Sequence, residues 1–456
     1  MPDGVYSLLI STIGLPYGYR AVAYEIDGKK YYSVYTASVL TRHYSVKHVI
    51  VVGLAGVGYP SKSSEDSIKK RIDELETVLQ GSSSDFFSYL PEEDREAYKK
   101  ALEQELKIKK KFIDEKPGDI YRFFLSQEGF SLRSEDPQPE LIYVSQSEIP
   151  VRVADKVMDV LSQEKGEQLA VLMDISHGLN WLPLQTERGV ELGLKASSFS
   201  FSKKITLEIV SSENKEKTAD LRMPEKEQLT RFATLTFSGE RSLKEAVWQL
   251  MGSYGKMRLI PLLAFFLEIS APLAITKLIS ENWREIEEEF SGNPEETGVV
   301  ARAFSCWIKN VAKDLWVPES GMNERALSDF ISRVIKAINP LGEELLRDQV
   351  KKLKDIKLKS RAYSELKNQG KLRLCYLMHD SSDLSASCSA HCREPQDFSR
   401  FDIRNFIAHS GFEESSVCVK YSNSDGQETL SYYYDPTLWG KILKDAEEYL
   451  KKISFG

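Results

Sequence analysis

The stretch LAVLMDISHGLN, residues 169–180, places an unbroken apolar run directly before a cluster of small and polar residues. A short run that is apolar throughout is typical of a β-strand buried on both faces. Small residues after such a strand let backbone N–H groups approach a ligand, above all an anion. The sequence therefore predicts a buried strand over 169–176 that leads into a candidate binding loop.

The first half of the chain repeats this pattern. Further short apolar runs are VYSLLIST (5–12), KHVIVVG (47–53), LIYVS (141–145) and ITLEIV (205–210). Segments with helical patterning lie between the runs, around 35–45, 65–80, 91–115, 148–164 and 180–195. Apolar strands that alternate with helices indicate a parallel sheet covered on both faces. We therefore predict a Rossmann-like α/β fold of the doubly wound type for this half.

The second half has a different pattern, which begins after the highly charged stretch at 212–228. Long amphipathic segments follow, and Pro261 is expected to break or kink the first of them, at 242–270. Alternating segments at 416–434 predict a late β-hairpin, followed by a final helix. The predicted domains are a Rossmann-like domain over 1–220, a linker over 221–240 and a mainly α-helical domain over 241–456.

Composition limits the class of protein. The chain has 456 residues, of which 41% are hydrophobic and 28% charged, as in soluble globular proteins of two or three domains. No apolar run approaches the roughly 20 residues that span a bilayer, and the first residues lack the basic segment of a signal peptide. We therefore expect no membrane contact and a cytoplasmic location.

Charge argues against a protein that coats nucleic acid along its whole surface. The formal net charge is −7, although this does not exclude a local basic groove. One basic stretch, at 349–374, holds nine Lys and Arg against two acidic residues. We interpret it first as a solvated helix face, and second as a phosphate-binding groove.

The first candidate site lies beyond the carboxyl ends of two predicted strands. In a doubly wound sheet, ligands bind at this edge near the point where the strand order reverses. The loop STIGLPYGY (11–19) follows the first strand, and DISHGLN (174–180) follows the fourth. A single histidine such as His177 is more often structural, but the whole cluster favours ligand binding. The predicted ligand-binding residues are Ser11, Thr12, Gly14, Asp174, Ser176, His177, Gly178 and Asn180.

The second candidate site is RNFIAHSG, residues 404–411, in the helical half. Asn405 and His409 are four residues apart and so share a helix face, and Gly411 signals the helix end. A histidine can act as general acid or base near neutral pH, and the guanidinium of Arg404 can hold a phosphate. The alternative interpretation is an ordinary helix terminus with a solvated arginine and histidine.

These groups can cleave RNA without a metal. The 2′-hydroxyl attacks the adjacent phosphorus and the 5′-oxygen leaves, a route that DNA cannot follow because it lacks the nucleophile. One Arg–Asn–His set supplies little more than one acid or base. A two-fold axis through the site would bring a second set opposite the first.

Both sites carry a resemblance to known families. DISHG at the strand end, with the small-residue loop after the first strand, resembles the CRISPR-associated Rossmann fold (CARF) domain, which senses cyclic oligoadenylates as a dimer. RNFIAH in a helical domain resembles the HEPN ribonuclease motif, in which paired motifs form one site across a dimer. Together they resemble the ancillary ribonucleases of type III CRISPR systems.

The resemblance implies an RNase that is switched on by a cyclic oligoadenylate, most often the tetraadenylate. It implies that Arg404, Asn405 and His409 are catalytic, with no metal or other cofactor. The expected partners are an RNA substrate and a second copy of the chain, in a homodimer or a higher even-numbered oligomer, with no membrane and no DNA. Three rivals remain: a non-catalytic sensor, a sensor that also degrades its own ligand, and a transcription regulator.

A cysteine cluster precedes the second site. Cys375, His379, Cys388 and Cys392 could form a four-ligand set, but the spacing departs from the usual short Cys-x2–4-Cys pairs of zinc sites. Zinc, a local disulfide and free thiols all remain open for these cysteines. We expect no metal.

Overall fold

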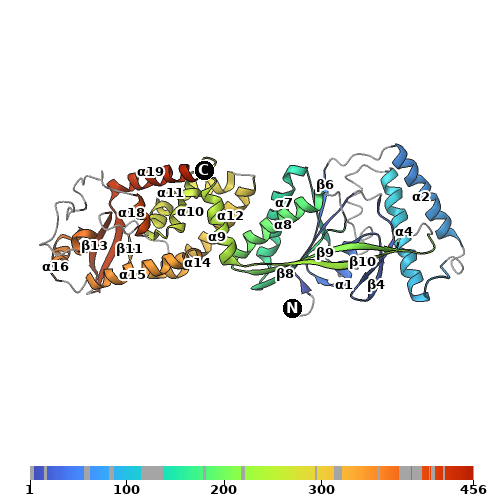
Figure 1. Cartoon of the computed structure of the whole chain (residues 1–456), viewed down its shortest axis with the longest axis horizontal. Helices are drawn as coiled ribbons and strands as arrows, with labels where there is room; N and C mark the ends of the chain where they lie inside the picture. Colours follow the sequence, from blue (N-terminus) through green and yellow to red (C-terminus); the bar gives the residue numbers. More distant parts are fainter. Residues whose placement is uncertain are drawn as a thin grey trace. The chain divides into compact units, whose positions relative to one another are not determined.

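Strand β2 (Leu8–Thr12) lies inside an eight-stranded sheet of the N-terminal half, between β6 (Val49–Leu54) and β8 (Gln168–Asp174). The chain adds β7 (Pro139–Val144) beyond β6, and β9 (Lys204–Glu216) beyond β8. Neighbouring strands in this series are parallel. The predicted Rossmann-like α/β sheet is therefore confirmed (Figure 1). From β2, the chain adds β6 and β7 in one direction and then β8 and β9 in the other, so the strand order reverses at β2.

The structure is a computed structural model. It describes residues 5–14, 18–55, 62–81, 87–114, 137–177, 181–216, 221–292, 295–312, 321–356, 360–378, 392, 403–409, 411, 416–424 and 427–454. Contacts divide the chain into two units, Met1–Gly239 and Glu240–Gly456. Within the described residues, no helix combines the length and the apolar character that crossing a bilayer requires.

Helices cover both faces of the sheet because its central strands are apolar on both sides. Along β2, Leu8 and Ile10 enter one core and Leu9 enters the other. The first core is completed by α7 (Ile149–Gln163) and α8 (Trp181–Ser200).

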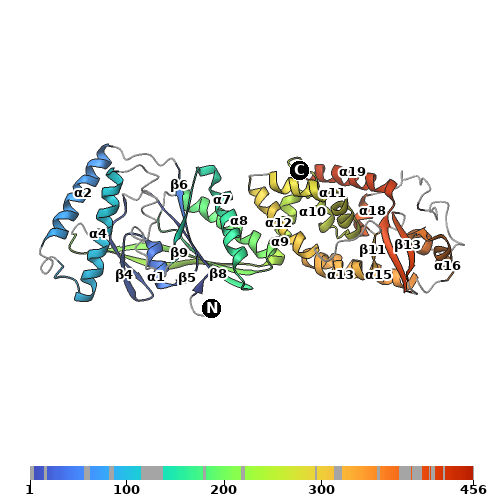
Figure 2. The same cartoon turned by 180° about the vertical axis from the view of Figure 1, so that it is seen from behind.

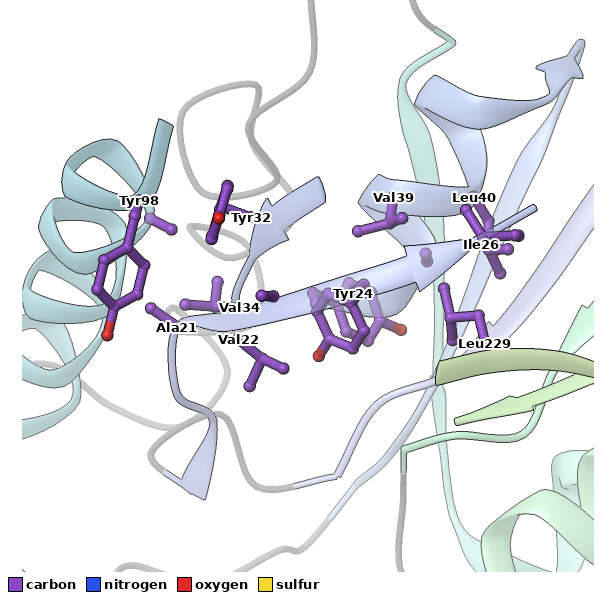
Figure 3. Close-up of a cluster of buried hydrophobic side chains, with 14 of the residues drawn as sticks. Ala21, Val22, Tyr24, Ile26, Tyr32, Val34, Val39, Leu40, Tyr98 and Leu229 are labelled. Atoms are coloured by element: carbon purple, nitrogen blue, oxygen red, sulfur yellow. The ribbon is translucent and has the colours of Figure 1, made fainter. Parts of the chain in front are cut away.

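The second core is completed by α1 (Thr36–His43), α2 (Lys62–Gln80) and α4 (Glu92–Asp114). Figure 3 shows Tyr98 of α4 beside Tyr32, with their ring centroids 5.6 Å apart. Short elements also belong to this unit: β1 (Val5–Tyr6), β5 (Ser45–Val46) and a 3-10 turn at Gln146–Glu148.

Three strands extend the sheet beyond β9, and the sequence did not predict them. They are β10 (Glu225–Phe237), β3 (Val22–Ile26) and β4 (Lys29–Ser33). β10 runs antiparallel to β9 and pairs in parallel with β3, while β3 and β4 form a hairpin.

β10 occupies most of the segment 221–240 that was predicted as a linker, so that prediction is wrong for these residues. The prediction failed because most β10 side chains are exposed or half-buried. A strand with such side chains can carry many charged residues and still pair in the sheet. The low apolar content of this segment therefore belongs to a solvent-exposed strand and not to a linker.

The C-terminal unit is mainly helical, as predicted. Its helices are α9 (Gly239–Met251), α10 (Leu259–Glu268), α11 (Pro272–Gly292), α12 (Glu296–Ala312), α13 (Glu324–Phe330), α14 (Lys336–Ile338), α15 (Pro340–Ile356), α16 (Ser360–Gln369), α17 (Leu374–Met378), α18 (Ile403–Ala408) and α19 (Pro436–Ser454), with a π-helical turn at Ile331–Ile335. Pro261 lies in the first turn of α10, where a missing N–H is tolerated, and the break precedes it.

The predicted hairpin at 416–434 is confirmed as β13 (Val417–Ser424) and β14 (Gln427–Tyr434). It belongs to a larger antiparallel sheet in which β11 (Met322–Asn323) pairs with β14 and β12 (Lys371–Arg373) pairs with β13. Figure 2 labels β11 and β13 of this sheet. The described part of this sheet thus collects strands from three separate stretches of the C-terminal half.

Candidate functional site

The first candidate site lies where β2 and β8 end. The two strands are neighbours in the sheet, and Ser11 pairs in register with Asp174. Because the strand order reverses at β2, this edge is the switch point at which doubly wound sheets bind ligands. The structure therefore brings the two predicted loop starts, at 11–14 and 174–177, to one edge of the sheet.

Asp174 is the centre of a buried hydrogen-bond network. Its carboxylate accepts hydrogen bonds from the Ser11 hydroxyl at 2.7 Å, from the Thr36 hydroxyl and from the Ser176 backbone N–H at 2.9 Å. Ser11 Oγ also contacts the Tyr35 hydroxyl at 2.9 Å. A buried carboxylate is tolerated only when it is bonded in this way, so Asp174 fixes the ends of β2, β8 and the start of α1.

His177 lies among tyrosine rings beside this network. Its ring stacks on Tyr35, with centroids 5.3 Å apart, and meets Tyr19 edge-on at 4.7 Å. Its Nε2 lies 3.4 Å from the backbone N–H of Thr36, which donates to it, and 3.5 Å from the Tyr24 hydroxyl. Burial lowers the pKa of His177, and the nearby Asp174 carboxylate opposes that shift. His177 is therefore neutral near pH 7.

Exposure separates the predicted ligand-binding residues into two groups. Ser11, Thr12 and Asp174 are fully buried and use their side-chain oxygens within the network; the Thr12 hydroxyl donates to the carbonyl of His177. Ser176 and His177 are half-buried and lie at the rim. Gly14 is buried, and its N–H donates to the Tyr19 hydroxyl at 2.7 Å. Predicted ligand contacts at Gly178 and Asn180 lie outside the described residues.

The Ser176 hydroxyl is the polar group of this site that lacks a hydrogen-bond partner within the described part of the chain. An unbonded buried hydroxyl costs free energy, since it has lost its contacts with water. The Ser176 hydroxyl is next to His177 in the chain and could donate a hydrogen bond to a bound ligand.

Sequence reasoning missed four residues of this site: Tyr19, Tyr24, Tyr35 and Thr36. Three come from the unpredicted β3 and from the start of α1, so their approach depends on the outer strands of the sheet. Tyr19 was inside the quoted loop at 11–19, but its ring gave no sign of packing on His177. Burial raises the pKa of both Tyr24 and Tyr35 well above the usual value, so both are neutral hydroxyls.

Buried charges of α4 hold the loop that carries Tyr19. Glu105 accepts a hydrogen bond from the Ala21 N–H at 2.9 Å, and Lys109 donates to the Tyr19 carbonyl at 3.0 Å. Arg71 of α2 pairs with Glu105 at 2.8 Å. Burial lowers the pKa of Lys109, although Glu105 opposes the shift. Helix α4 thus holds the backbone at Tyr19 and Ala21, and Arg71 of α2 pairs with the glutamate that does so.

The second candidate site is the short helix α18 (Ile403–Ala408) and the turn after it. Arg404 and Asn405 lie in the helix, and His409 follows directly and is exposed. Phe406 points into the core and is fully buried. The predicted helix end is confirmed: Gly411 has φ +75°, and its N–H donates to the Phe406 carbonyl at 2.9 Å. Because its side chain is exposed, the His409 imidazole is accessible to a substrate.

Three cysteines in this part of the chain are disulfide-bonded. Cys392 is bonded to Cys418 of β13, and Cys375 is also disulfide-bonded. A sulfur in an S–S bond cannot serve as a thiolate ligand, so the zinc alternative that used Cys375 and Cys392 is wrong. Cys418 was absent from the predicted cluster because it lies far from it in the sequence. His379 and Cys388 lie outside the described residues.

The basic stretch at 349–374 spans the end of α15, then α16 and β12. Two of its charges are engaged within the fold: Lys367 pairs with Glu428 at 2.5 Å, and Arg373 is buried against Asp435 at 2.8 Å. These pairs reduce the positive charge that the stretch offers to a partner.

The comparison with protein families matches each half of the chain to one model. Residues 8–214 match the CARF domain of the CRISPR system endoribonuclease Csx1, and residues 324–433 match the HEPN domain of the same endoribonuclease. No curated protein matches the chain. The two matches cover more than two thirds of the sequence, and each contains one of the two candidate sites. The chain therefore belongs to the CARF–HEPN ribonucleases of CRISPR systems.

Proposed function

We propose that this protein is a metal-independent endoribonuclease that cleaves single-stranded RNA when a cyclic oligoadenylate binds its N-terminal unit. The observation that carries the proposal is the position of Arg404, Asn405 and His409 within the HEPN match, at the end of a helix that leaves His409 exposed. In this proposal the three residues form one half of a catalytic centre, and a second copy of the chain supplies the other half.

The chemistry follows from the residue types. His409 takes the proton of the RNA 2′-hydroxyl as a general base, and the oxygen then attacks the adjacent phosphorus. Arg404 balances the charge that develops on the phosphoryl oxygens. The 5′-oxygen leaves with a proton from the second histidine. A single set lacks that second acid, which is why the proposal requires a two-fold dimer.

The N-terminal unit binds the activator at the ends of β2 and β8. Ser176 and His177 at the rim, with backbone N–H groups of the adjoining loops, supply donors for phosphate oxygens. A two-fold site fits an even-numbered ring better than an odd-numbered one. Among even-numbered rings we propose cyclic tetraadenylate, the ring that the resemblance to CARF–HEPN ribonucleases implies. The ligand shifts the enzyme toward its active form only if it binds that form more tightly than the resting form.

The test is an RNA cleavage assay of the full chain with EDTA present. We expect cleavage with cyclic tetraadenylate and little with the cyclic tri- or hexaadenylate. Replacement of the scissile nucleotide by its 2′-deoxy analogue should abolish the cut, because the nucleophile is gone. Cleavage that EDTA stops, or that the deoxy analogue leaves intact, would overturn the proposed mechanism.

A further inference from the structure

The helix that carries the HEPN motif is too short to be stable by itself. α18 has six residues, and isolated helices shorter than about 12 residues are marginal in water. Its position must therefore be set by the packing of neighbouring elements. Phe406 supplies the apolar part of that packing, since its ring lies 5.8 Å from the Tyr434 ring and 6.5 Å from the Phe266 ring.

Tyr434 makes a second, polar contact at the end of the motif. Its hydroxyl donates a hydrogen bond to the Gly411 carbonyl at 2.8 Å, and the side chain is buried. Gly411 in turn donates its N–H to the Phe406 carbonyl, so the residue stands between α18 and Tyr434. Only one residue, Ser410, separates His409 from this bonded glycine in the sequence.

The site around Gly411 has little room for adjustment. A Cβ at this position would lie 2.7 Å from the Tyr434 hydroxyl and 2.8 Å from Cβ of Ala271, the residue directly before α11. The positive φ of +75° also favours glycine. The chain after His409 is therefore pressed against α11 on one side and bonded by Tyr434 on the other.

Tyr434 is itself held in place. Its ring stacks on Trp439 of α19, with centroids 5.8 Å apart and an interplanar angle of 8°. The Trp439 Nε1–H donates to the Glu281 carboxylate of α11 at 2.6 Å. The next residue, Asp435, is buried in its ion pair with Arg373. Because the Tyr434 ring is held in place, its hydroxyl can hold the Gly411 carbonyl in place.

We infer that Tyr434 is a positioning residue of the ribonuclease: its hydrogen bond to Gly411 sets where the His409 imidazole lies. The inference rests on the proposed function, in which His409 acts as acid or base. A shift of about 1 Å in a catalytic group slows the chemical step far more than it weakens binding of the substrate. The loss should therefore fall on kcat and not on KM for RNA.

The test is Tyr434→Phe in the full chain with the activator present. The variant keeps the ring and its stacking on Trp439 and removes one hydrogen bond. We expect kcat to fall about fivefold, the rate equivalent of a typical net hydrogen-bond contribution of about 1 kcal/mol, with KM for RNA unchanged within twofold. Binding of cyclic tetraadenylate should be unchanged.

The matched control is Tyr432→Phe. Tyr432 is also buried and lies two residues earlier on the same face of β14, so the same atom is removed from the same sheet away from the end of α18. A merely structural role for Tyr434 predicts equal kcat for the two variants once both are folded, which thermal unfolding checks.

A His409→Ala arm separates the two claims. If His409→Ala abolishes cleavage while Tyr434→Phe cleaves like the wild type, the positioning role is wrong and the proposed function stands. If His409→Ala cleaves normally, the proposed function fails first. A fall in kcat confined to Tyr434→Phe and His409→Ala supports both claims.

Discussion

At the end of β8 a fully buried carboxylate holds three hydrogen bonds, whereas at the end of α18 an exposed histidine follows a six-residue helix. The Asp174 site draws its side chains from four elements and uses most of their polar atoms internally. The His409 site presents its imidazole outward, and Phe406 of its motif lies in the core. The polar groups of the Asp174 network bond to one another within one chain, whereas the proposed function makes the His409 motif one half of a catalytic centre.

This difference fits the work proposed for each unit. A sensor gains affinity when its groups are ordered before the ligand arrives, because less entropy is lost on binding. A nuclease centre made from two chains must instead leave its groups accessible to the second chain and to RNA. We therefore expect mutations in the N-terminal network to act mainly on stability, and mutations at the exposed motif to act mainly on rate.

The largest expected effect is that of His409→Ala. Loss of a general acid or base should lower the RNA cleavage rate about 100- to 10,000-fold, with no change in the unfolding midpoint, since the side chain is exposed. His48→Ala in the N-terminal unit is the control and should cleave as the wild type does. A lower unfolding temperature for His409→Ala would show that the His409 side chain stabilises the folded unit, which would contradict its assignment as an exposed catalytic group.

Asp435→Asn tests the buried ion pair between Arg373 and Asp435, the residue after Tyr434. Arg373 and Asp435 are 0% and 1% exposed, and removing one charge leaves the other buried and unpaired. We expect a loss of roughly 3–5 kcal/mol in the free energy of unfolding of the C-terminal unit, measured by urea denaturation. Glu447→Gln breaks the pair with the exposed Arg258 and should cost at most about 1 kcal/mol. Equal losses would contradict the assignment of a buried pair.

Asp174→Asn tests the internal network of the N-terminal site. Ser11 and Thr36 both donate to Oδ2 of Asp174, and the Ser176 N–H donates to Oδ1. The single acceptor oxygen of an amide cannot serve both places, so either the Ser176 N–H or the two hydroxyls lose their acceptor, and the charge is lost as well. We expect a loss of roughly 1.5–3 kcal/mol in the unfolding free energy of the N-terminal unit. Asp159→Asn, on the exposed side of α7, should change it by less than about 0.5 kcal/mol. Wild-type stability with weakened ligand binding would instead make Asp174 a direct ligand contact.

The pH dependence of stability gives a smaller effect. Burial lowers the pKa of His177 below its ordinary value of about 6.5, so at pH values between the two the unfolded chain binds more protons than the folded one. Stability should therefore fall as the pH drops below about 6.5, by at most about 1.4 kcal/mol per pH unit. His177→Asn should flatten this part of the curve of unfolding free energy against pH. Identical curves for both proteins would place His177 in water.

The sequence was sufficient for the parts of the fold that follow from local patterning. The parallel strands could be predicted because each is a short run that is apolar throughout, and the segments between them because they carry helical patterning. β10 could not, since a strand whose side chains are mostly exposed or half-buried has the composition of a charged linker. β3 was missed as well, although it brings Tyr24 to the site.

The candidate sites show the same limit. The motif at 404–411 could be found because its residues are neighbours in the chain. The burial of Asp174 could not be predicted, because it depends on Ser11 and Thr36, which are distant in the sequence. The bond between Cys392 and Cys418 was missed for the same reason: it joins a cysteine of the predicted cluster to one on β13.

The central claim is that two copies of the His409 motif form one catalytic centre. The direct measurement is the cleavage rate of enzyme made by co-expressing wild-type and His409→Ala chains in equal amounts, under saturating activator. If both imidazoles are needed, only dimers of two wild-type chains cut, and the rate falls to about one quarter of that of the wild type. A rate of about one half would mean that each chain works alone, and would contradict the account.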